Sequence, residues 1–171
     1  MERLRAILGS ALFLVIAPGI VAGVVPWWIS GWNFATPVAG YGLVRVVGIV
    51  FIAAGLPVLL EAFARFALHG LGTPAPVYPT RHLVVRGTYR HVRNPMYLAV
   101  EALIVGQGLL FGSAHLLVYA GLLAPVFHLF VIGYEEPTLR WTFGAEYEAY
   151  CAGVRRWLPR LSPWRGDAAQ R

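Results

Sequence analysis

The chain has 171 residues, of which 58% are hydrophobic and only 13% are charged. Soluble domains carry about a quarter charged residues, so this composition excludes an ordinary water-soluble domain. The formal net charge is +6, all basic residues are arginines, and they flank apolar runs, which favours contact with anionic lipid headgroups and speaks against a nucleic-acid partner. The single cysteine, Cys151, excludes an intrachain disulfide and a cysteine-rich metal site.

Four apolar runs predict an all-α integral membrane protein, because a spanning helix needs about 20 apolar residues. The first run begins after two arginines, as a signal peptide does, but it is long for one and more runs follow, so we expect an uncleaved helix. It ends in Trp27 and Trp28, which suit a membrane interface. The chain is expected to be a single domain of residues 1–171, with spans at about 6–29, 41–68, 96–112 and 116–134.

Arginine placement predicts the orientation of these spans. Basic residues cluster before the first span, in the linker before the third and in the tail, whereas the linker 31–40 and the turn 113–115 contain no arginine. With four spans, all basic clusters fall on the same side of the membrane. The positive-inside tendency therefore predicts an inner-membrane, multi-pass protein with both termini in the cytoplasm.

The polar tail, residues 135–171, is predicted to contain one amphipathic helix. Leu139, Phe143, Tyr150 and Val154 recur at helical spacing, with Tyr147 on the same stripe. We expect this helix to pack on the membrane face or on the basic linker.

Charged and histidine side chains within the spans need partners, because a lone charge in lipid costs several kcal/mol. Glu61 and Arg65 are four residues apart and are expected to pair on one helix face. Glu101 has no local partner, which leaves a packing hydrogen bond or a polar pocket as alternatives. His128 is interpreted either as a satisfied core residue or as part of a site.

Two dense polar segments, residues 80–97 and 134–150, are predicted to lie at the cytoplasmic ends of the last two spans. The first belongs to the loop 70–95, in which Gly87 permits a tight turn. Asn94 is expected to be the N-cap of the third span, with Pro95 in its first turn. A site is one interpretation; a helix start, together with ion pairs from the two glutamates at 135–136 to nearby arginines, is the other.

The arrangement LV..G.Y...RNP.Y, followed by a helical hairpin and then EE..L...FG..Y..Y...V.R..P, resembles the isoprenylcysteine carboxyl methyltransferase and phospholipid methyltransferase superfamily. The resemblance covers roughly residues 70–160. It implies an S-adenosylmethionine-dependent methyltransferase with a cytoplasmic cofactor pocket, which the loop and the tail helix cover. The cofactor-binding residues that it implies are Arg81, His82, Leu83, Val84, Tyr89, Arg93, Asn94, Pro95, Met96, Tyr97 and Glu135.

Two positions depart from the pattern of the superfamily. Many members have a histidine at the position of Asn94, although asparagine can still donate and accept hydrogen bonds. The carboxyl-methylating enzymes have an arginine at the position of Val131, so a prenylcysteine carboxylate is disfavoured as the acceptor. A lipid amine, a hydrophobic thiol and an isoprenylcysteine carboxylate stay open, with Glu136, His128 and Glu101 as candidate bases.

A non-enzymatic membrane protein, such as a transport or assembly factor, is the alternative function. Its charged ends would serve topology alone, which requires arginines in any order. The turn, the tyrosines and the glutamates occur together here, and this combination favours the enzyme.

Overall fold

The structure is a computed structural model that describes residues 2–34, 41–65, 68 and 83–166, with the backbone alone for residues 2–7 and 10. The described part is helical and contains no strand, which confirms the predicted all-α class. Two segments, η1 and η4, are π-helical, and η3 is a 3₁₀ turn. The elements are α1 (Glu2–Gly19), η1 (Ile20–Val24), α2 (Val25–Ser30), α3 (Tyr41–Arg65), η3 (Gly87–Arg90), α4 (Pro95–Phe111), α5 (Ala114–Phe130), η4 (Val131–Glu135), α6 (Glu136–Phe143) and α7 (Ala145–Gly153).

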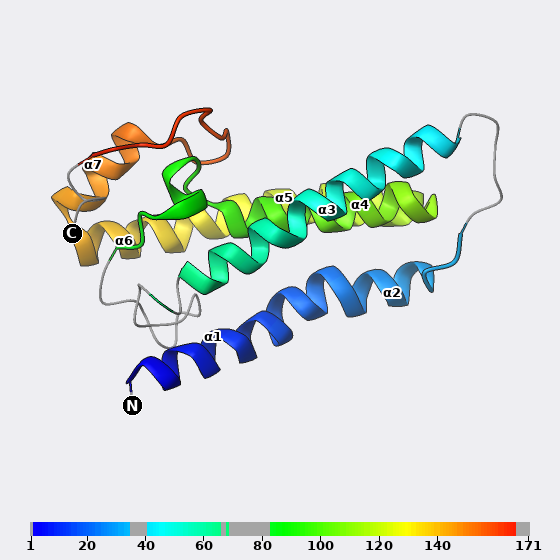
Figure 1. Cartoon of the computed structure of the whole chain (residues 1–171), viewed down its shortest axis with the longest axis horizontal. Helices are drawn as coiled ribbons and strands as arrows, with labels where there is room; N and C mark the ends of the chain where they lie inside the picture. The colour runs from blue at the N-terminus through cyan, green and yellow to red at the C-terminus, as the bar shows by residue number, and fades with distance from the viewer. Residues whose placement is uncertain (1, 35–40, 66–67, 69–82, 167–171) are drawn as a thin grey trace.

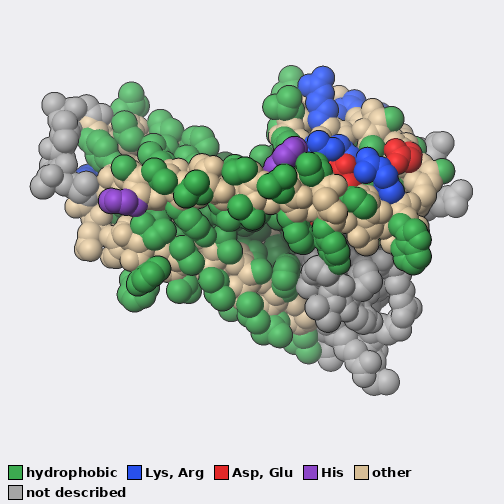
Figure 2. Space-filling view, turned by 180° about the vertical axis from the view of Figure 1, so that it is seen from behind, with side chains coloured by type: hydrophobic (Ala, Val, Ile, Leu, Met, Phe, Trp, Pro, Cys, Tyr) green, Lys and Arg blue, Asp and Glu red, His purple; other side chains and the backbone are tan. Residues whose placement is uncertain are grey.

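Three helical stretches are long and apolar enough to cross a membrane, namely Ala11–Ser30, Tyr41–Arg65 and Ala114–Phe143. The shorter apolar helix α4 lies among them. Large apolar side chains are exposed along these helices, including Leu43 at 74% and Leu122 at 66%. Hydrophobic side chains cover most of the helical body in Figure 2. Such a surface is stable against lipid rather than water, so the protein is a membrane protein.

Among the described helices, α3 and α4 pack together most extensively, and small residues make their approach possible. A Cβ atom on Gly48 would lie 2.7 Å from the carbonyl oxygen of Gly106, so neither position has room for a larger residue. Leu59, Phe63 and Ile104 form the core nearby. This packing fixes α4, which begins at the predicted polar loop.

Each π-helical segment lies just before a proline. Pro26 follows η1. It has no N–H group to donate, and its ring clashes with the carbonyl group four residues earlier in a regular α-helix. The carbonyls of Val21 and Ala22, five and four residues earlier, therefore lose that donor. Tyr119 Oη donates to the Val21 oxygen at 3.1 Å, and Gln107 Nε2 donates to the Ala22 oxygen at 2.8 Å. These bonds tie the first helix to α4 and α5.

Polar side chains gather at one end of the bundle. The start of α1, the loop 83–94, α6 and α7 all lie at this end in Figure 1. Charged side chains cluster there in Figure 2, whereas the helical body is mostly hydrophobic. We call residues 83–97 together with 135–166 the polar end.

The structure departs from the sequence-based expectations mainly in the tail. The predicted single amphipathic helix is two helices, α6 and α7, which meet at Gly144. Gly144 has φ 50° and ψ −123°, a conformation that only glycine adopts readily. The fourth helix does not end at Tyr134 but continues through η4 into α6. Between α4 and α5, Gly112 has a left-handed conformation and the Ser113 hydroxyl caps α5.

Candidate functional site

The loop before α4 is fastened to α3 at the predicted glycine turn. Gly87 has φ +58°, and a Cβ atom there would collide with the Glu61 carboxylate. Glu61 Oε2 accepts a 2.6 Å hydrogen bond from Thr88 Oγ1, while Glu61 Oε1 accepts from Arg65 Nε at 2.7 Å. The predicted Glu61–Arg65 pair is thus confirmed, and it also holds the turn in place.

Tyr89 fills the space behind this turn. Its side chain is buried with Val84 and Ala62, and its carbonyl oxygen accepts a 2.7 Å bond from Tyr150 Oη. Burial raises the pKa of both phenols above the ordinary value, so they stay neutral at physiological pH. The loop therefore packs through buried side chains against α3 and is hydrogen-bonded to α7.

Glu135 is the last residue of η4 and faces α4. Tyr97 Oη, in the first turn of α4, donates to Glu135 Oε1 at 2.5 Å. The second Glu135 oxygen makes no hydrogen bond within the described part of the chain. Pro137 follows, and the wider π turn lets the two consecutive glutamates face different partners.

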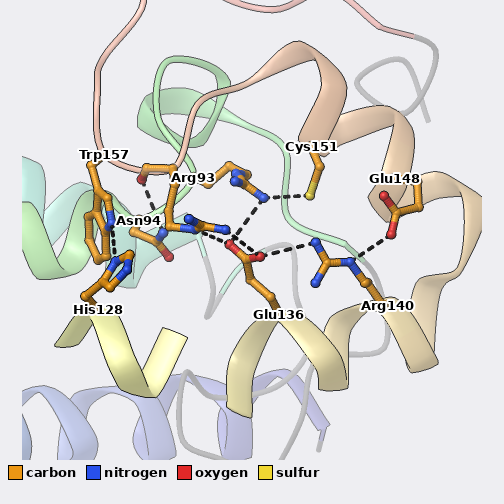
Figure 3. Close-up of polar contacts among 9 residues, drawn as sticks. Arg93, Asn94, His128, Glu136, Arg140, Glu148, Cys151 and Trp157 are labelled. Atoms are coloured by element: carbon orange, nitrogen blue, oxygen red, sulfur yellow. Dashed lines mark hydrogen bonds and ion pairs between the residues drawn. The ribbon is translucent and has the colours of Figure 1, made fainter. Parts of the chain in front are cut away.

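Glu136 faces the tail instead, and only 3% of it is exposed. Its carboxylate lies among guanidinium groups in Figure 3. Arg156 binds both oxygens, at 2.5 and 3.0 Å, while Arg93 and Arg140 approach at 3.4 and 3.3 Å. The hydrogen bond to Glu136 raises the pKa of Arg156, which stays charged. This network joins the loop, α6 and the tail.

The tail beyond α7 lies across the loop and is bonded to it through the backbone. Arg93 N donates to the Arg155 oxygen at 3.0 Å, and Arg160 N and Trp164 N donate to the oxygens of His91 and Arg90, both at 2.9 Å. Figure 1 shows this segment above the loop.

His128, on α5, is also engaged with the tail. Trp157 Nε1 donates to His128 Nδ1 at 3.0 Å, as Figure 3 shows. An indole N–H can only donate, so Nδ1 is unprotonated and the neutral imidazole carries its proton on Nε2. The Trp157 ring lies 6.0 Å from the His128 ring and 6.4 Å from the Tyr97 ring, measured between ring centroids.

Most of the predicted cofactor-binding residues come together at the polar end. Tyr97 and Glu135 are in contact, and Met96 packs against both the bundle core and the cluster around Tyr89. Asn94 is the N-cap residue, but its side chain does not cap the helix; its Nδ2 donates to the Arg156 oxygen at 3.2 Å. Arg81 and His82 lie outside the described residues. The cofactor role of the set stays a prediction, and its other members here are Leu83, Val84, Tyr89, Arg93 and Pro95.

Several side chains of this end were not singled out as site residues from the sequence. Thr88 and Trp157 gave no signal, because their roles depend on contacts between distant segments. Cys151 accepts a 2.7 Å hydrogen bond from Arg93 Nη1, so it is a packing residue of the network around Glu136. Arg140 could have been found, because it follows Glu136 at the i+4 spacing of a helical ion pair.

Apolar helices long enough to span a membrane, with a loop and a tail folded over a carboxylate at one end, define a membrane protein with a polar cluster at one end of its helices. The sequence model of the phospholipid methyltransferase family matches residues 43–146, which is more than half of the chain. The protein therefore belongs to the phospholipid methyltransferase family. The match begins in α3, includes the loop, α4, α5 and α6, and ends in the first turn of α7.

No curated protein and no solved structure matches the chain. Membership of a methyltransferase family and the helices that can span a membrane indicate a membrane methyltransferase.

Proposed function

We propose that the protein transfers a methyl group from S-adenosylmethionine to an amine-bearing membrane lipid, and that the polar end holds the cofactor. The observation that carries this proposal is Glu135. Its carboxylate is half-buried, Tyr97 fixes one oxygen, and the other oxygen is uncommitted among the described residues.

The residues of this end fit the cofactor chemically. An uncommitted carboxylate oxygen suits the ammonium group or the ribose hydroxyls of S-adenosylmethionine, because charge-assisted hydrogen bonds are the strong ones. Val84, Tyr89 and Pro95 are buried and would form the apolar wall. The cofactor supplies a methyl group on a sulfonium, while the chain would orient the acceptor and exclude water.

The tail segment supports the proposal because it can exclude water. It bonds to the loop at three backbone positions, which are Arg93, His91 and Arg90. In this proposal the tail segment would cover the site on its water-facing side, and the bilayer would border the opposite side. An acceptor dissolved in the membrane would then enter laterally, without crossing water.

One feature disfavours a prenylcysteine carboxylate, and a second suits a phospholipid headgroup. Val131 is 1% exposed and offers no counter-charge to a carboxylate, which would be costly to desolvate there. An open cavity of about 410 Å³ borders the glycine turn and is lined by Arg65, Arg86 and Arg90, with Val85 and Gly87. Guanidinium groups bind phosphate well, and a phospholipid headgroup carries one.

Calorimetric titration of the purified protein with S-adenosylhomocysteine tests the cofactor site. We expect Glu135→Ala to weaken binding roughly 10- to 150-fold, since an interaction with a charged group contributes about 1.5–3 kcal/mol. Glu146→Ala, which removes an exposed carboxylate on α7, is the matched control and should bind like the wild type.

A Glu135→Ala protein that loses thermal stability and yet binds with wild-type affinity would show that Glu135 is structural. If the wild-type protein itself does not bind S-adenosylhomocysteine, the cofactor is wrong and the site must be reassigned.

We also propose that the polar end faces the cytoplasm, which its arginines support. Single cysteines at His115 and Ser162, both exposed, can be introduced in a Cys151→Ser background. An impermeant maleimide should label position 115 from outside intact cells and position 162 only after lysis. Labelling of position 162 in intact cells, with position 115 protected, would invert the topology.

A further inference from the structure

Glu101 is a carboxylate within α4 whose oxygen Oε1 is buried and has no hydrogen-bond partner in the described structure. It lies four residues after Tyr97, and therefore on the same face of the helix, about 6 Å further along its axis. A carboxylate at this depth costs free energy unless it has a partner. The position is thus unexplained by the fold.

Other acidic side chains of the bundle do have such partners. Glu61 is bonded to Arg65 and Thr88, and Glu136 is surrounded by guanidinium groups. Tyr119, on α5, is the titratable side chain within electrostatic range of Glu101. Its hydroxyl donates to the Val21 oxygen, so that proton is already committed. Tyr97, one turn away, donates to Glu135.

The two other candidate bases are also committed. Glu136 accepts hydrogen bonds from Arg156 and Arg140, which hold it as an anion with little tendency to take a proton. His128 already accepts the Trp157 N–H at Nδ1, and its other nitrogen carries a proton. Outside the Tyr97–Glu135 pair itself, Glu101 therefore retains an acceptor atom without a partner in the described structure, about one turn along α4 from Tyr97.

The surroundings of Glu101 suit a ligand that arrives from the membrane. The side chain as a whole is partly exposed, and its neighbours along α4, Val100 and Leu103, belong to the apolar core. In such surroundings a carboxylate attracts a positive charge strongly. A neutral acceptor would leave it unpaired.

We propose that Glu101 binds the ammonium head of the acceptor lipid and takes one proton from it. This inference rests on the proposed function, because it assigns the acceptor of the same site. One N–H bond of the ammonium breaks, the proton moves to a Glu101 oxygen, and the electron pair stays on nitrogen. The neutral amine is then a nucleophile, and Glu101 later returns the proton to solvent. No redox partner is required.

The test compares wild-type protein with Glu101→Gln, which keeps the size of the side chain but cannot take the proton. Binding of dodecyldimethylamine in detergent should be roughly 10- to 100-fold weaker in the variant, as expected for loss of a charge-assisted bond. Binding of S-adenosylhomocysteine should be unchanged. Methyl transfer to an aminolipid near pH 7 should fall about 100-fold or more, the usual contribution of a general base.

The pH dependence separates a base from a merely structural residue. Alkylamines lose their proton near pH 10 in water, so at higher pH the acceptor arrives neutral and needs no base. The deficit of Glu101→Gln should therefore shrink as the pH approaches that value, and Glu101→Asp should restore part of the activity near pH 7. Glu146→Gln serves as the matched control.

Equal amine binding and equal methyl transfer in Glu101→Gln and wild type would overturn the role of Glu101 while leaving the proposed function intact. A deficit of the same size at every pH, with amine binding unchanged, would also overturn it, since it would mark a structural residue. Wild-type protein that binds S-adenosylhomocysteine but methylates thiols and no amine would refute the amine acceptor and with it the role of Glu101, while leaving the cofactor site intact.

Discussion

The two π-helical segments, η1 and η4, have the same backbone conformation but make different contacts. Each begins six residues before a proline, Pro26 or Pro137, and each interrupts an apolar spanning helix. In η1, neighbouring helices donate side-chain hydrogen bonds to the carbonyls of Val21 and Ala22. In η4, the change of phase directs Glu135 toward α4 and Glu136 toward the tail.

The difference shows that a π turn in an apolar helix can serve either to connect helices or to orient functional side chains. In η1, Gln107 and Tyr119 donate hydrogen bonds to the freed backbone carbonyls. The π turn there connects the first helix to α4 and α5. Where η4 leads into α6, the same irregularity lies beside two side chains that bind other segments, Glu135 to Tyr97 and Glu136 to Arg156. Only the second outcome lies within the part of the chain that matches the family. The variants that follow separate these outcomes.

Replacing Glu136, which directly follows η4, by alanine should cause the largest loss of stability. The change leaves the guanidinium groups of Arg93 and Arg156 without their shared anion, and breaking a buried pair costs roughly 3–5 kcal/mol. We expect the apparent melting temperature in detergent to fall by roughly 10 °C. Thermal-shift measurement checks this. Glu148→Ala removes only an exposed partner of Arg140 and should change the melting temperature little.

A melting temperature of Glu136→Ala equal to that of the wild type would mean that the carboxylate does not hold the polar end together. The base role first assigned to Glu136 would then regain support.

Exchanging each proline for alanine gives a smaller and more selective effect. Pro137→Ala restores an N–H donor after η4 and allows an ordinary α turn, which would move Glu135 away from Tyr97. We expect S-adenosylhomocysteine to bind about tenfold more weakly, as for the loss of one oriented hydrogen bond. Pro26→Ala makes the same change in η1 and should leave binding within about twofold. Calorimetric titration of both variants with S-adenosylhomocysteine measures the two affinities. Equal affinities would show that η4 does not orient Glu135 for binding.

Local sequence patterns predicted the parts of the site that depend on neighbours along the chain. Gly87 marked its turn, Asn94 and Pro95 marked the start of α4, and the spacing of Glu61 and Arg65 marked their ion pair. The fold class followed from the apolar runs.

Contacts between distant segments could not be predicted in this way. The stripe through Phe143 and Tyr147 continues in helical phase, so it did not reveal the break at Gly144. The bond between Trp157 and His128 joins residues 29 positions apart and depends on how the tail folds back. The π turns were also missed, because an apolar run looks the same in sequence whether its hydrogen bonds span four or five residues.

A π turn is, in effect, one residue more than an α-helix needs to cover the same distance. Deleting a single residue from 20–24 or 131–135 would let the backbone close into an ordinary helix while the flanking helices stay in phase. Elsewhere in α3 or α4 the same deletion would rotate half a helix by about 100° and put Gly48 or Gly106 out of its contact. Length differences of one residue among relatives should therefore collect in these two segments, and in the second of them such a gap should accompany the loss of the Glu135 contact.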